Sequence, residues 1–202
     1  MAIVFKRDAL ELKSCSVRLL DSDQQRCVFS ASLSSRKSRA VLIVATTHLE
    51  SGKCQPADLR VQQLRSILSD LSRSPIDAVL LAGDLNLRSS EARKSKVGED
   101  GGKKWHDVWH LAGADAANAD TCQGRRYDRI YSKRGASLTY VANSFGVLAA
   151  DPSDHKGLRC RFVLRATWQT TSVPLRGLAR PLSPWSARTL WVSWHRATTH
   201  QV

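Results

Sequence analysis

Short apolar runs separated by polar residues occupy the first quarter of the chain and predict successive β-strands. Leucines and valines recur between residues 10 and 20 in partly alternating runs, and residues 27–29 continue the pattern. Residues 40–45 are apolar throughout, as expected of a central strand that is covered on both faces. The pattern therefore predicts a sheet whose most buried strand lies at residues 40–45.

A different period follows and predicts an amphipathic helix over residues 57–72. Apolar side chains recur there every three or four residues, at Leu64, Ile67, Leu68 and Leu71. This spacing places them along one face of a helix. Pro56 stands where the first helical turn would begin, a position that proline favours.

The second half of the chain carries shorter signals. Residues 77–82 predict another buried strand, which Gly83 ends with a sharp turn. Residues 88–104 are polar, contain glycine and mix charges, which predicts a mobile surface loop. A short helix is expected over residues 105–111, and further strands are expected at residues 126–132, 138–142 and 158–164.

The composition changes after residue 165. The last segment holds Trp168, Trp185, Trp191 and Trp194, together with prolines and arginines, and it contains no acidic residue. No hydrophobic period emerges, so residues 166–202 are expected to form a basic, poorly ordered extension. The folded domain is then expected to comprise residues 1–165.

The charge narrows the range of partners. The formal net charge of +13 indicates a polyanionic partner, with nucleic acid as the leading choice. A basic surface that is merely solvated explains the charge equally well. No apolar run approaches the roughly 20 residues needed to cross a bilayer, so no membrane partner is expected. The five cysteines lack zinc-finger spacing, which favours reduced thiols in a soluble intracellular protein.

Candidate chemistry lies where predicted strands end. Asp84 and Asn86 follow one strand and are separated by one residue, so their side chains leave the sheet in related directions. Asp84 would orient or deprotonate an attacking water, and Asn86 would donate hydrogen bonds to a phosphate. A solvent-facing turn is the simpler alternative, because Gly, Asp and Asn are common turn residues.

Two histidines extend this set. His155 follows Asp154, and a protonated imidazole can stabilise a pentacovalent phosphate or help the leaving group depart. Adjacent side chains do not pair freely, so Asp128 or Asp84 is an alternative partner for His155. His48 follows a buried strand and either contacts the phosphate or is a structural histidine bonded to backbone.

A basic residue completes the candidates. Arg88 lies two residues after Asn86 and could hold a flanking nucleic-acid phosphate, although exposed arginines commonly have no such role. Phosphodiester hydrolysis needs a cation at the phosphoryl oxygens, an oriented water, stabilisation of transition-state charge and protonation of the leaving oxygen. Together the candidates indicate a metal-assisted phosphodiesterase.

Six short motifs, taken together, resemble the endonuclease/exonuclease/phosphatase superfamily. In chain order they are T-H-L-E-S at 47–51, R-x-x-Q-L at 60–64, A-G-D-L-N at 82–86, D-V-W at 107–109, R-Y-D-R-I-Y at 126–131 and S-D-H-K-G-L at 153–158. Within the superfamily, the H-L-E-S, N-L-R and D-R-I pieces favour the tyrosyl-DNA phosphodiesterases. The resemblance extends over residues 2–164 and leaves out the basic C-terminal segment.

The resemblance implies a four-layer αββα sandwich of the DNase I type and a Mg²⁺ cofactor, for which Mn²⁺ can substitute. It also implies a nuclear DNA-repair enzyme that hydrolyses the 5′-phosphotyrosyl bond between a trapped topoisomerase and DNA. The family places an asparagine motif and its principal Mg²⁺-binding glutamate before the region where this chain begins. The expectation is therefore an N-terminally incomplete domain whose metal ligands are not assigned.

The resemblance also implies roles for single residues. Asp84 becomes the water-activating carboxylate, and Asn86 becomes a phosphate ligand. His155 becomes the transition-state stabiliser, with Asp154 beside it as a metal-binding or orienting residue. His48 is similar to the other phosphate-contacting histidine of the family.

Two features of the resemblance concern the substrate groove. Arg88 is similar to the DNA-contacting arginine of the family. The segment at residues 115–125 is shorter than in the family and lacks the Thr-Trp pair expected near Thr121. Substrate contacts from that segment are therefore not predicted.

Two alternative functions stay open at this point. R-Y-D-R-I-Y and S-D-H are general within the superfamily, so a relative that acts on RNA or other phosphodiesters is a close rival. A shortened chain without the chief metal ligand could instead be catalytically impaired and act only as a basic nucleic-acid binder. The reason is that the metal supplies much of the charge neutralisation.

Overall fold

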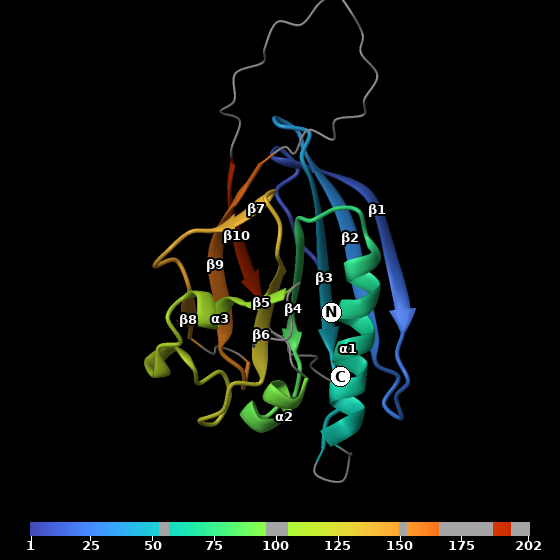
Figure 1. Ribbon diagram of the computed structural model, residues 1–202, viewed down its shortest axis with the longest axis vertical. Helices are drawn as coiled ribbons and strands as arrows, with labels where there is room; N and C mark the ends of the chain where they lie inside the picture. The colour runs from blue at the N-terminus through green and yellow to red at the C-terminus, as the bar shows by residue number, and fades with distance from the viewer. Residues whose placement is uncertain (53–56, 96–104, 150–152, 166–187, 195–202) are drawn as a thin grey trace, which may run out of the picture.

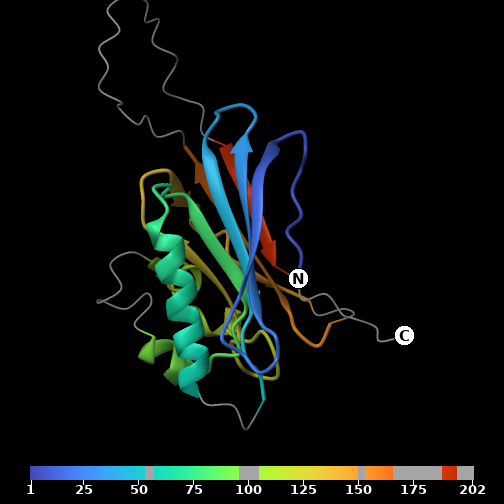
Figure 2. The same ribbon diagram turned by 90° about the vertical axis from the view of Figure 1, so that its right-hand side faces the viewer.

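Two β-sheets pack face to face, and a long helix covers the outer face of the larger sheet (Figures 1 and 2). The computed structural model describes residues 1–52, 57–95, 105–149, 153–165 and 188–194. The larger sheet contains β1 (Leu10–Leu19), β2 (Cys27–Ser35), β3 (Val41–His48), β4 (Val79–Asp84), β5 (Trp105–Asp107) and β6 (Asp128–Lys133). The smaller sheet contains β7 (Leu138–Tyr140), β8 (Gly146–Leu148), β9 (Gly157–Leu164) and β10 (Arg188–Trp194).

The helical elements are short except for the first. They are α1 (Ala57–Arg73), α2 (Ser89–Lys94), α3 (Val108–Leu111) and the 3₁₀ turn η1 (Ala116–Asn118). No helix in the described part of the chain is both long and apolar enough to cross a membrane.

The order of strands in the larger sheet is β1-β2-β3-β4-β6-β5. The first three strands are antiparallel neighbours. The connection through α1 then allows β4 to run parallel to β3, because parallel neighbours need a crossover of this kind. β6 joins the other side of β4 in the antiparallel direction. The ends of β3 and β4 therefore lie beside the start of β6.

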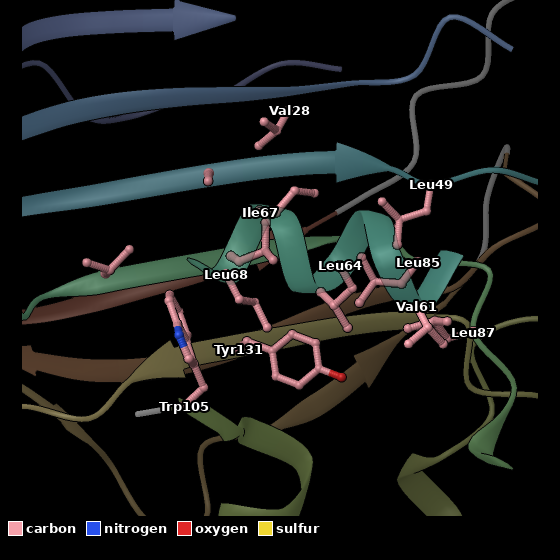
Figure 3. Packing of buried hydrophobic residues seen from close by; sticks show 13 residues of the cluster. Val28, Leu49, Val61, Leu64, Ile67, Leu68, Leu85, Leu87, Trp105 and Tyr131 are labelled. Atoms are coloured by element: carbon pink, nitrogen blue, oxygen red, sulfur yellow. The ribbon is translucent and has the colours of Figure 1, made fainter. Parts of the chain in front are cut away.

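α1 packs on the larger sheet through the apolar stripe that the sequence predicts (Figure 3). Leu64, Ile67 and Leu68 are buried and share one cluster with Leu85 and Tyr131. Burial of a side chain of this size stabilises the fold by about 1.5–3 kcal/mol. The prediction of an amphipathic helix over residues 57–72 is confirmed.

The opposite face of the larger sheet packs on the smaller sheet. Leu42, Leu80 and Ile130 from the larger sheet join Leu158 and Phe162 of β9 in a second buried cluster. Helix, sheet and sheet form consecutive layers, which Figure 2 shows edge-on. This arrangement confirms the expected α/β sandwich class.

The structure differs from the prediction at residues 88–104, where a surface loop was expected. Residues 89–94 form α2, and residues 96–104 lie outside the described residues. Glu91 caps the start of this six-residue helix by accepting a hydrogen bond from the backbone N–H of Arg88, and its buried ion pair with Arg60 ties the helix to α1. Local sequence could not reveal a partner that lies on α1.

Two further differences concern strands. Residues 105–107 form β5 and not the start of a helix, because they pair with the edge of β6 and bury Trp105. Residues 188–194, inside the segment expected to be a poorly ordered extension, form β10 and pair with β9. Threonine, valine and tryptophan favour strands once an edge is available. The rest of that segment lies outside the described residues.

Candidate active site

Three neighbouring strands bring polar side chains to one edge of the larger sheet. His48 ends β3 and is the register partner of Asp84, which ends β4. Asp128 begins β6 and pairs with Asp84 on the other side. Directly paired residues point to the same side of a sheet, so these three side chains lie together. His155 reaches the same point from the loop before β9.

The close pairing of β3 and β4 depends on Gly83. A Cβ atom added at Gly83 would lie 2.0 Å from the carbonyl oxygen of Thr47, a distance that no relaxation of a side chain can relieve. Glycine is therefore required at this point for the backbones to approach each other.

Replacing Gly83 with alanine is expected to lower the free energy of unfolding by about 3 kcal/mol or more. The reason is that β3 and β4 must move apart at the candidate site. Gly146→Ala is the matched control, because its Cβ would lie 3.4 Å from the flexible Arg159 side chain. Urea denaturation of the two variants measures the difference, and equal losses would contradict the assignment.

Asp84 is the centre of the cluster and is 1% exposed. Its Oδ2 lies 3.3 Å from Nε2 of His48 and 3.8 Å from Nδ1 of His155. Its Oδ1 accepts a 3.0 Å hydrogen bond from the backbone N–H of Asn86. The structure thus brings together one carboxylate and the two histidines that the sequence singled out.

Asn86 fixes the turn that follows β4. Its φ of 50° lies in the left-handed region, which asparagine tolerates better than most residues. Its side-chain Nδ2 donates a 3.1 Å hydrogen bond to the carbonyl of Leu49, which ties the loop after β3 to the loop after β4. The amide carries a second N–H, and this is the group that it can offer to a phosphate.

The partner of His155 is Asp128. Nδ1 of His155 lies 2.8 Å from Oδ2 of Asp128, whereas the adjacent Asp154 is exposed. An ionised carboxylate only accepts, so Nδ1 carries the hydrogen and Nε2 is left as the reactive ring nitrogen. The ring of Tyr127 stacks on the imidazole at a centroid distance of 6.4 Å. Of the two orienting partners considered for His155, Asp128 makes this bond.

The environment of Asp128 disfavours the ionised form of its side chain. Burial, followed by the nearby charge of Asp84, raises the pKa of Asp128 to about 6. A carboxyl with a raised pKa holds its proton more tightly in the folded protein. Its contribution to stability is therefore present at acidic pH and is lost as the pH rises through about 6. Buried carboxyl groups with a raised pKa are typical of functional sites.

The cluster also fits a divalent cation. Ligand atoms of Asp84, Asp128 and His155 all lie within 4.8 Å of one another. In the described part of the chain, Oδ1 of Asp128 is buried and accepts no hydrogen bond. Two close carboxylates repel each other unless a cation lies between them, and carboxylate oxygens suit Mg²⁺ or Mn²⁺. The carboxylates of Asp84 and Asp128 are therefore the candidate metal ligands, and His155 lies next to them.

A basic cavity of about 610 Å³ is lined by residues of α2, α3 and β6, and the clustered side chains do not line it. Its lining includes Arg88, Arg93, Arg125, Arg126, Trp109 and His110. Arg88 is exposed and follows Asn86 by two residues. The contact of Arg88 with a flanking phosphate stays a prediction.

A buried ion network supports the floor of this cavity. Oδ2 of Asp107 lies 2.8 Å from Nη2 of Arg126 and 3.3 Å from Nη1 of Arg129. The guanidinium of Arg126 also stacks 4.4 Å above the ring of Trp109. Burial alone would raise the pKa of Asp107, but the charges of Arg126 and Arg129 outweigh it and hold that pKa below its usual value.

Other polar motif residues are structural. Glu50 is fully buried and accepts hydrogen bonds from Ser22 and Gln63. Gln63 also accepts a bond from the backbone N–H of Glu50 and so fixes the loop after His48. Arg60 pairs with Glu91 at 2.7 Å and joins α1 to α2.

Sequence reasoning missed two functional positions. Asp128 was considered only as a partner of His155, although it is also a candidate metal ligand. Asp107 belongs to the D-V-W motif, but no role was predicted for it from the sequence. The available signal was the placement of Asp128 at the start of a predicted strand, but only the pairing of β6 with β4 shows that it faces Asp84.

Comparison with solved structures shows which proteins share this fold. The fold matches the endonuclease/exonuclease/phosphatase from Bacteroides vulgatus with a TM-score of 0.62 at 14% identity, over 80% of this chain and 69% of that chain. It matches D. rerio TDP2 complexed with single strand DNA product with a TM-score of 0.64 at 23% identity, over 77% and 69%. The chain therefore shares the fold of these two proteins.

The sequence is similar to proteins named tyrosyl-DNA phosphodiesterase 2 (TDP2). The Danio rerio protein is 31% identical over 140 residues, which are 60% of this chain and 38% of the relative. The Homo sapiens protein is 28% identical over 188 residues, 79% of this chain and 49% of the relative. The chain thus spans half or less of the length of these relatives. No protein-family model matches the sequence.

Proposed function

We propose that this chain is a metal-dependent phosphodiesterase that hydrolyses the bond between a tyrosine and a DNA 5′ phosphate. The observation that carries the proposal is the convergence of His48, Asp84, Asp128 and His155 at one sheet edge. The similarity to TDP2, one structure of which contains a single-stranded DNA product, supports DNA as the substrate.

The protein's own residues would divide the reaction between them. Asp84, held by His48 and by the backbone of Asn86, would orient the attacking water and take up its proton. His155, with Nδ1 held by Asp128, would direct Nε2 at the phosphate and stabilise its developing charge. Asn86 would donate its second amide N–H to a phosphoryl oxygen.

The substrate's remaining charge would be met by two groups. A divalent cation bound by the carboxylates of Asp84 and Asp128 would supply charge neutralisation at the phosphoryl oxygens when present. Arg88 would hold the next phosphate of the DNA strand, because it is exposed and follows Asn86 by two residues. Trapped topoisomerase–DNA adducts are the substrate class that this chemistry suits. We expect the protein to act in the nucleus.

The test is release of a 5′-tyrosyl group from labelled single-stranded DNA, with Mg²⁺ and then with EDTA. We expect Mg²⁺-dependent release by the full chain and its loss in Asp84→Asn. Asp70→Asn is the matched control, because it makes the same change at a half-buried position of α1, outside the candidate site, where Asp70 pairs with Arg73 and Arg18.

The possible outcomes separate the competing functions. Cleavage of RNA or of unmodified phosphodiesters without tyrosyl release would identify a superfamily relative with another substrate. Salt-sensitive DNA binding without cleavage of any substrate would leave a basic nucleic-acid binder. Release that survives EDTA, or that survives in Asp84→Asn, would contradict the site assignment itself.

A further inference from the structure

A second ligand group lies beside the candidate active site and shares His155 with it. Ligand atoms of Cys122, Asp154 and His155 lie within 4.8 Å of one another. Cys122 and His155 are buried, whereas Asp154 is exposed. An ion can therefore reach the group from solvent along the side that Asp154 occupies.

The two loops that carry these ligands are tied together. The backbone N–H of Lys156 donates a 2.8 Å hydrogen bond to the carbonyl of Thr121. Cys122 is itself bridged to Arg125 across a tight turn. The hydroxyl oxygen of Thr121 accepts hydrogen bonds from the backbone N–H groups of Tyr127 and Asp128. Cys122 and His155 thus stand on backbone that is held in place before any ion binds.

The donor set is that of a zinc site. A thiolate, an imidazole and a carboxylate suit Zn²⁺, whereas Mg²⁺ prefers oxygen ligands alone. Ligand atoms around tetrahedral zinc stand about 3.5 Å apart. The exposed Asp154 side chain can rotate to close the remaining gap. Three protein ligands would leave a fourth position for water.

The orientation of His155 also favours an ion. Asp128 holds Nδ1 at 2.8 Å, which leaves the lone pair of Nε2 for a metal. A carboxylate that binds the far nitrogen of a metal-bound histidine is a frequent support of zinc sites. The hydrogen bond from Nδ1 to Asp128 would therefore orient Nε2 for catalysis and also for binding zinc.

We propose that Cys122, Asp154 and His155 form a zinc-binding site that inhibits the enzyme. Binding displaces the thiol proton of Cys122 to solvent, and Nε2 of His155 becomes a zinc ligand. His155 can then no longer act on a phosphate. The inhibition rests on the proposed phosphodiesterase function, but the binding of zinc does not.

Binding is tested without any activity measurement. Cd²⁺ is titrated into a full-length reference chain that carries Cys15→Ser and Cys54→Ser, and the ultraviolet absorption of a cadmium–thiolate bond is followed. We expect saturation at one ion per chain and competition by Zn²⁺. Cys122→Ser should abolish the absorption, whereas Cys160→Ser, a buried thiol of β9, should keep it. Asp128→Asn should weaken Zn²⁺ binding by about 10–100-fold.

Persistence of the absorption in Cys122→Ser would overturn the site. An unchanged Zn²⁺ affinity in His155→Gln would also overturn the proposed zinc site. This second variant is the test to use if Cys122→Ser fails to give a folded circular dichroism spectrum. A second arm measures 5′-tyrosyl release with Mg²⁺ present. Zn²⁺ should inhibit the reference chain and should no longer inhibit Cys122→Ser. Binding without inhibition would overturn the inhibitory role alone, and an inactive chain would leave the binding result intact.

Discussion

Replacing His155 with alanine is expected to lower the rate of 5′-tyrosyl release by about 10²–10⁴-fold, the range that a positioned acid–base group supplies. His155 is 6% exposed and is held by Asp128, so bulk water cannot take its place. His106→Ala removes a histidine from β5, outside the candidate site, and should leave the rate within about twofold. Single-turnover kinetics with saturating Mg²⁺ measure both variants.

The pH dependence of the same reaction gives a second readout. Asp128 must be ionised to accept the Nδ1 hydrogen of His155, and its pKa is raised to about 6 by burial and by Asp84. The rate should therefore fall as the pH decreases, and Mg²⁺ bound at Asp128 should move this fall to a pH below about 6. Asp128→Asn should remove this acidic limb. An unchanged profile in that variant, or an unchanged rate in His155→Ala, would show that this pair has no part in the chemistry.

Replacing Asp107 with alanine is expected to lower the free energy of unfolding by about 3–5 kcal/mol at neutral pH. The change leaves Arg126 and Arg129 without their shared carboxylate, and Arg129 is only 1% exposed. It also removes the cap of α3, because Oδ1 of Asp107 accepts from the backbone N–H of Trp109. Urea denaturation of the folded chain measures the loss.

The matched control is Asp120→Ala. Asp120 pairs with Lys156, but the two side chains are 38% and 40% exposed, so the loss should stay within about 1 kcal/mol. The pKa of Asp107 lies below its usual value, so its stabilisation is present above pH 4 and declines as the pH falls further. Equal losses in the two variants, or an Asp107 effect that grows on acidification, would contradict the buried network.

Periodic segments with one buried face were predictable from sequence. The stripe from Leu64 to Leu71 placed α1 almost to the residue, because helix periodicity and burial have the same cause. Strand β4 was recognised from its continuous apolar run. In contrast, α2, β5 and β10 depend on distant partners, namely Arg60 on α1, β6 and β9. No local pattern contains that information.

The sequence by itself determined which chemical groups are available, since Asp84, Asn86, His155, His48 and Arg88 could all be named from strand ends and motif order. Only the tertiary structure decided how they meet. Pairing across β3, β4 and β6 places Asp128 against Asp84, and this alone identifies the partner of His155 and the candidate metal ligands. The physical reason is that register between strands, and not distance along the chain, decides which side chains share one side of a sheet.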